Sequence, residues 1–339
     1  MINDILNKIK SKSATEIQFR LGHKTLIKNQ NEWVELDHEN LSLSEWEDLK
    51  DLCLENAEKL TLETKGFVRA VYQNKEQQWS LSISEYRDSH RAYFSLVLDL
   101  QVAQSIQSAV FWDKVKTKKG LYLFVGEQHQ GKTALLKNIL TEIKKDSPRL
   151  MAVHGHSASM VSLNMDSVVF LNEDSLNWDY QHPIYDGIDI IVVDFNAISN
   201  WEKWIKFAEE GRCVFVTLSA SSVENSLDQI ITKIGNSVHY LRRFYEVLSL
   251  VCYQKLTPGH ESGLHEILVM HDSFKKLLLE NDFFKLMILA DKDILQKNYQ
   301  SINQSIIQNL VRRKIDIKTA FKSTPHPDDL DQQLKKMGL

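Results

Sequence analysis

One short segment constrains the fold of this chain more than any other. In Gly120–Thr133 an apolar run ends at Gly126, and Gly131, Lys132 and Thr133 follow after four intervening residues. Apolar residues then recur at helical spacing. This is the pattern G-x-x-x-x-G-K-[ST] in the setting that a phosphate-binding loop requires, a strand leading into a helix. The segment therefore predicts an α/β domain with an anion site at the end of one strand.

Each part of this loop has a chemical reason. Glycines let the backbone wrap closely around an anion, and the free amides at the helix start point toward it. The Lys132 ammonium adds a positive charge near the outer phosphates of ATP, and the Thr133 hydroxyl can bind Mg²⁺. The residues expected to contact the nucleotide are Gly126, Gln130, Gly131, Lys132, Thr133 and Ala134.

The variable positions of the loop, Glu127 to Gln130, are unusual because none of them is small. Glu127 places a negative charge where the phosphates would lie, which would weaken nucleotide binding. The alternative to a phosphate loop is a chance match in a buried strand–turn–helix. The flanking strand and helix, both present, favour the phosphate loop.

Composition narrows the class of protein. The chain has 339 residues, 43% hydrophobic and 25% charged, which is typical of a soluble globular protein with room for two domains. A net charge of -4 argues against a general nucleic-acid binder or a membrane-surface protein. The 3 cysteines form no paired motif and predict reduced thiols in a cytoplasmic protein. Because no apolar run has bilayer length, we expect no transmembrane segment, and any action at a membrane would need docking.

The pattern along the chain predicts four parts. Before the loop, short alternating runs and one helix over Leu43–Leu60 indicate an α+β domain with a mainly antiparallel sheet. After it, strands and helices alternate as in a RecA-like core, and the chain from His271 onward is predicted to be helical. No element is predicted over 235–247. The expected boundaries are 1–98 for the N-terminal domain, 99–119 for a linker, 120–270 for the core and 271–339 for a helical C-terminal extension.

Two further positions are candidates for chemistry. In ATP-driven machines the strand of the loop is paired with a second one that ends in an acid, and Asp194 closes the apolar run Ile190–Val193. There Asp194 would hold Mg²⁺ beside Thr133, and the alternative is a carboxylate that caps a helix. His154 and His156 end an earlier strand. Because no third ligand is spaced to join them, we expect surface or turn histidines there rather than a metal site.

The order of segments resembles the hexameric ATPases of secretion systems and type IV pili, most of all the pilus-retraction (PilT/PilU) branch. The resemblance covers nearly the whole chain. Besides the loop, it is carried by Ala14–Lys28 (family ASDLHL…IR), Gly211–Leu218 (GHLVFGTLHT), Val251–Pro258 (QKLLP), Glu266–Val269 (FEIM), Tyr299–Leu310 (MQTMDQSL) and Asp328–Leu330 (PEEL).

The resemblance implies a PAS-like N-terminal domain before the RecA-like core, with ATP and Mg²⁺ as cofactors. It also implies a homo-hexamer, or a mixed ring with a related pilus ATPase. The expected partner is the pilus platform protein of the inner membrane, with no nucleic acid. The expected location is cytoplasmic, peripheral at the inner membrane through that docking.

This sequence departs from the family pattern at several positions. Val153–Ser157 has no acid where the family carries an acidic box, and Phe195 stands at the position of a glutamate. Ser219 replaces a histidine, Ser95 replaces an arginine, and the family's arginine-bearing helix matches the shorter segment 180–189, which has no arginine. The resemblance therefore implies that the acid that activates water and the arginines that act in trans are absent. Each loss lowers the hydrolysis rate by orders of magnitude.

These losses predict a catalytically degenerate accessory subunit that binds nucleotide with little or no turnover. The first alternative is an active retraction motor with relocated catalytic groups, such as Asp194 in two roles. A third hypothesis is a phosphate-loop kinase or an unrelated NTPase, which the N-terminal domain and the helical tail disfavour. Arg20–Gly22 also resembles a cyclic-dinucleotide-binding motif, although its place in a predicted turn favours a structural role for Gly22.

Overall fold

The computed structural model describes residues 15–29, 32–37, 39–73, 77–87, 89–96, 102–117, 119–146, 149–154, 167–171, 177–193, 200–235, 237–257, 263–279 and 298–338. The described residues fall into two compact units, 15–96 and 102–338. None of the helices in these ranges combines the length and the apolar composition that a bilayer-spanning segment needs.

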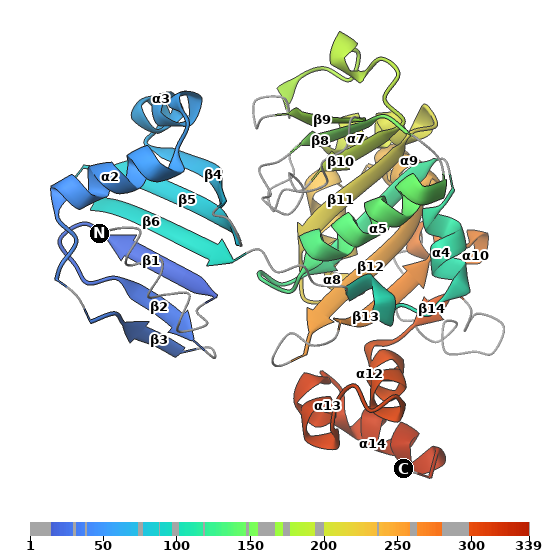
Figure 1. The fold of residues 1–339 in the computed structure, drawn as a ribbon. Coiled ribbons are helices and arrows are strands. Elements are labelled where there is room, and N and C mark those ends of the chain that lie inside the picture. The colour runs from blue at the N-terminus through green and yellow to red at the C-terminus, as the bar shows by residue number, and fades with distance from the viewer. Residues whose placement is uncertain are drawn as a thin grey trace. The chain divides into compact units, whose positions relative to one another are not determined.

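The first unit is built on a six-stranded antiparallel sheet in the order β3-β2-β1-β6-β5-β4 (Figure 1). Buried and less buried side chains alternate along β1, where Ile17 and Phe19 are fully buried; this is typical of a sheet with one face on a core. Gly22 has a φ of 76° in the turn after β1, which confirms its structural role there. The strands are β1 (Glu16–Arg20), β2 (Leu26–Asn29), β3 (Glu32–Glu35), β4 (Phe67–Gln73), β5 (Gln78–Tyr86) and β6 (Ser89–Leu96).

Two helices cover this sheet, α2 (Leu43–Cys53) and α3 (Asn56–Lys65), and Trp46 of α2 is fully buried in the shared core. The prediction of a single helix over Leu43–Leu60 is wrong. The residues between the two helices have extended backbone. The Glu55 amide donates to the Glu58 carboxylate at 2.8 Å, so a new helix begins there without a glycine or proline to mark it.

The second unit is built on an eight-stranded sheet in the order β14-β13-β12-β7-β11-β10-β8-β9 (Figure 1). The run from β12 to β9 is parallel, and β13 and β14 add antiparallel strands at one edge. Strands β7, β8 and β10 are buried at every residue, which explains their unbroken apolar sequences. The strands are β7 (Gly120–Gly126), β8 (Met151–His154), β9 (Val168–Leu171), β10 (Ile190–Val193), β11 (Cys213–Ser219), β12 (Leu248–Leu256), β13 (Gly263–Val269) and β14 (Tyr299–Gln300).

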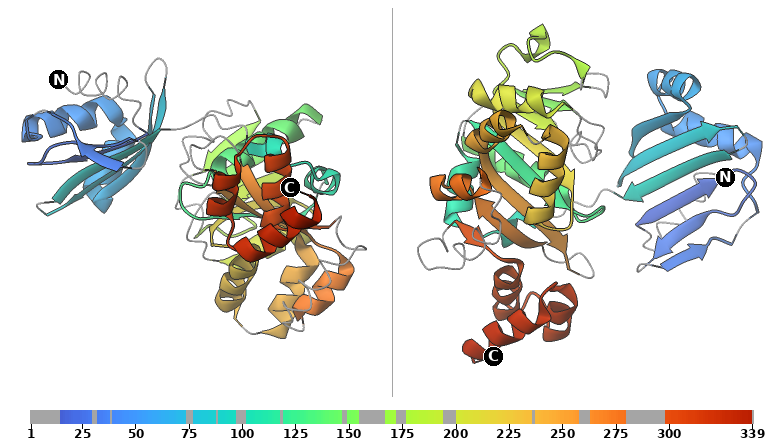
Figure 2. Two further views of the ribbon diagram at one scale, coloured as in Figure 1. Left: turned by 90° about the horizontal axis from the view of Figure 1, so that it is seen from below. Right: turned by 180° about the vertical axis from the view of Figure 1, so that it is seen from behind.

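Helices cover both faces of this sheet, as in a RecA-like core. Helix α5 (Lys132–Asp146) lies on the front face in Figure 1, and the view from behind in Figure 2 shows α7 (Trp201–Glu209), α8 (Val223–Ile234) and α9 (Val238–Val247) on the other. No element is expected from the sequence where α9 lies. Its buried residues, which include Leu241 and Phe244, join the core beneath the sheet.

The remaining described elements flank the sheet or follow it. They are the 3-10 helices η1 (Val102–Ser105) and η3 (Pro183–Tyr185) and the helices α4 (Ala109–Val115), α10 (Asp272–Leu279), α12 (Ile302–Val311), α13 (Ile317–Ser323) and α14 (Pro327–Lys336). The helices predicted after His271 leave 291–300 without an element, and there Gln300 of β14 pairs with Ile267 of β13. The structure confirms the predicted fold class, an antiparallel α+β domain followed by a RecA-like core.

Candidate phosphate-binding site

The candidate site lies where β7 ends at the carboxyl edge of the parallel sheet. Strand β7 pairs with β11 on one side and β12 on the other, so its position is fixed from both sides. The chain then turns from Gly126 to Gly131, and α5 begins at Lys132. Gly131 has a φ of 74°, in the left-handed region where a side chain is disfavoured. The predicted strand, loop and helix are therefore all present.

The Lys132 side chain folds back over the loop. Its Nζ donates to the carbonyl oxygens of Gly126 at 2.8 Å and Glu127 at 2.7 Å, and the residue is only 8% exposed. An ammonium in this position can exchange carbonyl partners for the oxygens of a bound phosphate, which are stronger acceptors because they are charged. Thr133 and Ala134 follow in the first turn of α5.

The side chains of Glu127, Gln128 and His129 are exposed, so the large residues of the loop face solvent. His129 has a φ of 61°, which gives the loop a second left-handed residue. The Glu127 charge still acts nearby. Burial first, and then the charges of Glu127 and Glu266, raise the pKa of Tyr253 to about 12.

Two buried polar residues beside the loop escape sequence reasoning, because they lie on strands far along the chain. Gln254 of β12 is fully buried, and its Nε2 donates to the Gln130 carbonyl. In return, Gln130 Oε1 accepts a hydrogen bond of 2.7 Å from the amide of Leu256. His265 of β13, also fully buried, lies behind Gln254 with 3.2 Å between His265 Nε2 and Gln254 Oε1. The pairing of β7 with β12, and of β12 with β13, brings these residues near the loop.

The predicted partner strand of the loop is not adjacent to β7. Strand β11 lies between β7 and β10, the strand that ends just before Asp194, so the expectation of direct pairing is wrong. Asp194 itself, with Phe195, lies outside the described residues, and its Mg²⁺ role stays a prediction. Ser219, at the position of the family's histidine, is paired with Gly126 at the end of β11 and therefore lies beside the loop.

His154 is not a surface or turn histidine, contrary to the sequence-based expectation. It ends β8 fully buried, with its Nε2 3.3 Å from the hydroxyl of Tyr185. Lys203 donates to the same hydroxyl at 3.0 Å. Burial first, and then the Lys203 charge, lower the pKa of His154 to about 3, so the imidazole is neutral. His156 lies outside the described residues, and the described residues contain no cluster of side chains that could hold a metal ion.

The sequence matches no known protein-family profile and no curated protein sequence. Solved structures do match it. The pilus retraction motor PilT with bound ADP gives a TM-score of 0.71 at 16% identity, over 97% of this chain and 98% of PilT. The Legionella pneumophila ATPase DotB gives 0.69 at 15% identity, over 94% and 93% of the two chains. The Yersinia pseudotuberculosis DotB gives 0.69 at 14%, over 95% and 92%. The chain therefore has the fold of the PilT and DotB ATPases, as its sequence resemblance implied.

Proposed function

We propose that this chain binds ATP or ADP through the loop from Gly126 to Thr133 and turns ATP over slowly or not at all. The observation that carries the proposal is the placement of the Lys132 ammonium, which the carbonyls of Gly126 and Glu127 hold over the loop. The nearly full-length likeness to PilT, which was solved with ADP, supports a nucleotide as the ligand. Thr133 and Asp194 are the residues proposed to hold Mg²⁺, which would offset the negative charge of the phosphates.

The weak turnover rests on what the sequence has in place of the family's catalytic groups. Phe195 cannot accept a proton from water, and Ser219 beside Gly126 cannot carry the charge of a histidine. Loss of a general base costs about 10²–10⁴ in rate, and loss of an arginine supplied in trans about 10³–10⁵. We therefore propose an accessory role in place of a motor role, with the nucleotide acting as a structural ligand.

The proposed setting is a ring. The chain would assemble as a homo-hexamer or enter a mixed ring with a related active ATPase, on the cytoplasmic side of the inner membrane. Its partner there would be the platform protein of a type IV pilus or secretion system. The second candidate function is an active retraction motor, which is favoured by the match to PilT over nearly the full length of both chains.

A nucleotide titration tests the binding half of this proposal. Fluorescently labelled ADP is titrated with and without Mg²⁺ against the natural chain, Lys132→Ala and the control Lys144→Ala, which removes an exposed lysine from the same helix. We expect Lys132→Ala to weaken binding by about 10- to 100-fold, since a hydrogen bond to a charged group contributes about 1.5–3 kcal/mol. Lys144→Ala should bind as the natural chain does. Equal binding by the natural chain and Lys132→Ala would contradict the assignment of the site.

A further inference from the structure

A series of linked polar side chains leads from the phosphate loop into the interior of the second unit. It begins with the clasp between Gln254 and Gln130, in which each side chain bonds to the backbone of the other's segment. Gln254 is fully buried, and Gln130 is half-buried. Because a buried amide without partners is costly, the two glutamines hold one another in place.

The second link is His265. Since Gln254 Nε2 donates to the loop, Gln254 Oε1 faces the imidazole, and His265 Nε2 must carry the hydrogen between them. The opposite ring nitrogen, Nδ1, lies 3.4 Å from Ser105 Oγ in η1. The backbone amide of His265 donates to Ser305 Oγ of α12 at 3.0 Å, and Ser305 is also buried. The chain of contacts thus leads from the loop to α12 and to η1.

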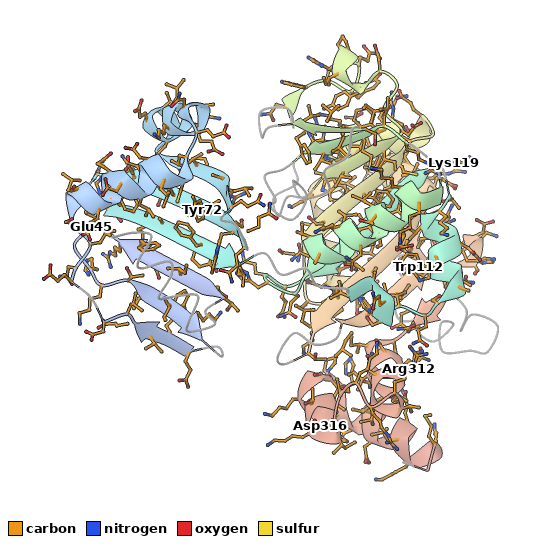
Figure 3. All side chains as sticks on the ribbon, in the orientation of Figure 1. Glu45, Tyr72, Trp112, Lys119, Arg312 and Asp316 are labelled. Carbon is orange, nitrogen blue, oxygen red and sulfur yellow. The ribbon has the colours of Figure 1, made fainter. Side chains whose placement is uncertain are left out.

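Direct packing couples the loop to Gln254 as well. A Cβ atom on Gly126 would lie 2.5 Å from the Gln254 carbonyl oxygen, and one on Gly131 would lie 2.7 Å from Gln254 Nε2. Gly126 and Gly131 therefore both pack directly against Gln254. At the far end of α12, Arg312, labelled in Figure 3, donates to Gln107, so a second contact joins α12 to the region of η1.

We propose that Gln254 is a positioning residue for the phosphate loop and that His265 links the loop to α12, so that nucleotide binding and the order of the C-terminal helices are coupled. The coupling to nucleotide rests on the proposed function, whereas the positioning role does not. The physical reason is that a displaced loop leaves Gln254 Nε2 and the Leu256 amide without the partners that Gln130 provides. A buried hydrogen-bond network resists displacement, because breaking one of its bonds leaves a buried polar group unpaired.

Hydrogen exchange on the nucleotide-free chain tests the positioning role. Gln254→Met keeps the length of the side chain and removes its polar atoms. Ser249→Ala, a buried polar residue at the other end of β12, is the matched control. We expect amides of the loop to exchange about tenfold faster in Gln254→Met, as two lost hydrogen bonds imply, and to be unchanged in Ser249→Ala. Unchanged exchange in the loop of Gln254→Met would overturn the proposal.

The positioning role can also be tested by a substitution in the loop itself. If Gln254→Met does not fold, Gln130→Ala removes the return bond to Leu256 and gives the same readout. Faster loop exchange in Gln130→Ala supports the clasp between Gln254 and Gln130. Loop exchange in Gln130→Ala at the same rate as in the unsubstituted chain overturns it.

The coupling is tested by adding saturating ADP with Mg²⁺. In the natural chain we expect slower exchange both in the loop and in the first turn of α12. In His265→Leu only the loop should respond, while His265→Gln, which can still donate to Gln254 Oε1, should restore the response of α12. Slower exchange confined to the loop of the natural chain would overturn the coupling. If the natural chain does not respond to ADP at all, the proposed function fails together with the coupling, and the nucleotide-free experiment still decides the role of Gln254.

Discussion

Gly131 shows how a single residue can be required for two independent reasons. Its φ of 74° is disfavoured for any residue with a side chain, and a Cβ atom there would meet Gln254 Nε2 at 2.7 Å. Gly211 offers the first reason without the second, because its φ is 95° but nothing lies within 4 Å of a built Cβ atom. The two positions therefore separate backbone strain from crowding.

We predict that Gly131→Ala destabilises the second unit by about 2–5 kcal/mol, since strain of about 1–2 kcal/mol adds to crowding of about 1–3. Gly211→Ala should cost about 1–2 kcal/mol from strain alone. Chemical denaturation followed by tryptophan fluorescence measures both. Equal losses in the two variants would show that the contact between Gly131 and Gln254 contributes nothing.

For single residues, the sequence predicts the positions that belong to one contiguous motif. Gly126, Gly131 and Lys132 belong to one contiguous pattern, and the structure places them together in the loop. Gln254 and His265 have no such signal, because glutamine and histidine in buried strands are recognisable only once the neighbouring strands are known. Asp194 is an intermediate case: a strand does end just before it, but its proposed role depends on residues outside the described ranges.

The helices α8 and α9 differ in how their first turns are capped. Ser222 at the start of α8 accepts a hydrogen bond of 3.0 Å from the Asn225 amide, whereas Ser237 at the start of α9 makes no such bond. We predict that Ser222→Ala costs about 1 kcal/mol and that Ser237→Ala costs close to nothing. Hydrogen exchange in the first turns of α8 and α9 is the measurement. A loss of protection in α9 as large as that in α8 would contradict the prediction.

Helix α9 could have been predicted, because its buried residues Leu241, Phe244 and Tyr245 recur at helical spacing. The other elements that sequence reasoning misses share a physical cause. The break between α2 and α3 is made by two residues in extended backbone and a first-turn carboxylate, with no glycine or proline to mark it. The two-residue strand β14 is defined by its pairing with β13. In each case tertiary contacts decide what local propensity leaves open.

The stability of the whole second unit should depend on pH because it buries two neutral histidines. Burial lowers the pKa of His265 to about 3, and burial with the Lys203 charge does the same for His154. The unfolded chain, in which histidine has a pKa of about 6.5, takes up protons first as the pH falls. The stabilising effect of a neutral folded-state imidazole is therefore complete above pH 6.5 and is lost progressively toward pH 3.

We predict that acidification below pH 6.5 costs up to about 1.4 kcal/mol per pH unit for each of the two histidines. Thermal unfolding between pH 7 and pH 4.5 measures the slope. His154→Gln, which stays neutral, should flatten it, and the control His239→Gln at an exposed position should not. Identical slopes for all three proteins would contradict a role for buried imidazole.

For the molecule as a whole, we propose that a complete phosphate loop lacks the groups that cleave ATP. ATP turnover by the purified chain, at a nucleotide concentration that saturates its binding, tests this proposal. We predict stoichiometric ATP binding that depends on Lys132, with hydrolysis at least about 10²-fold below that of an active ring, the smallest loss expected for a missing general base. Steady turnover at the rate of an active motor, abolished by Lys132→Ala, would contradict it.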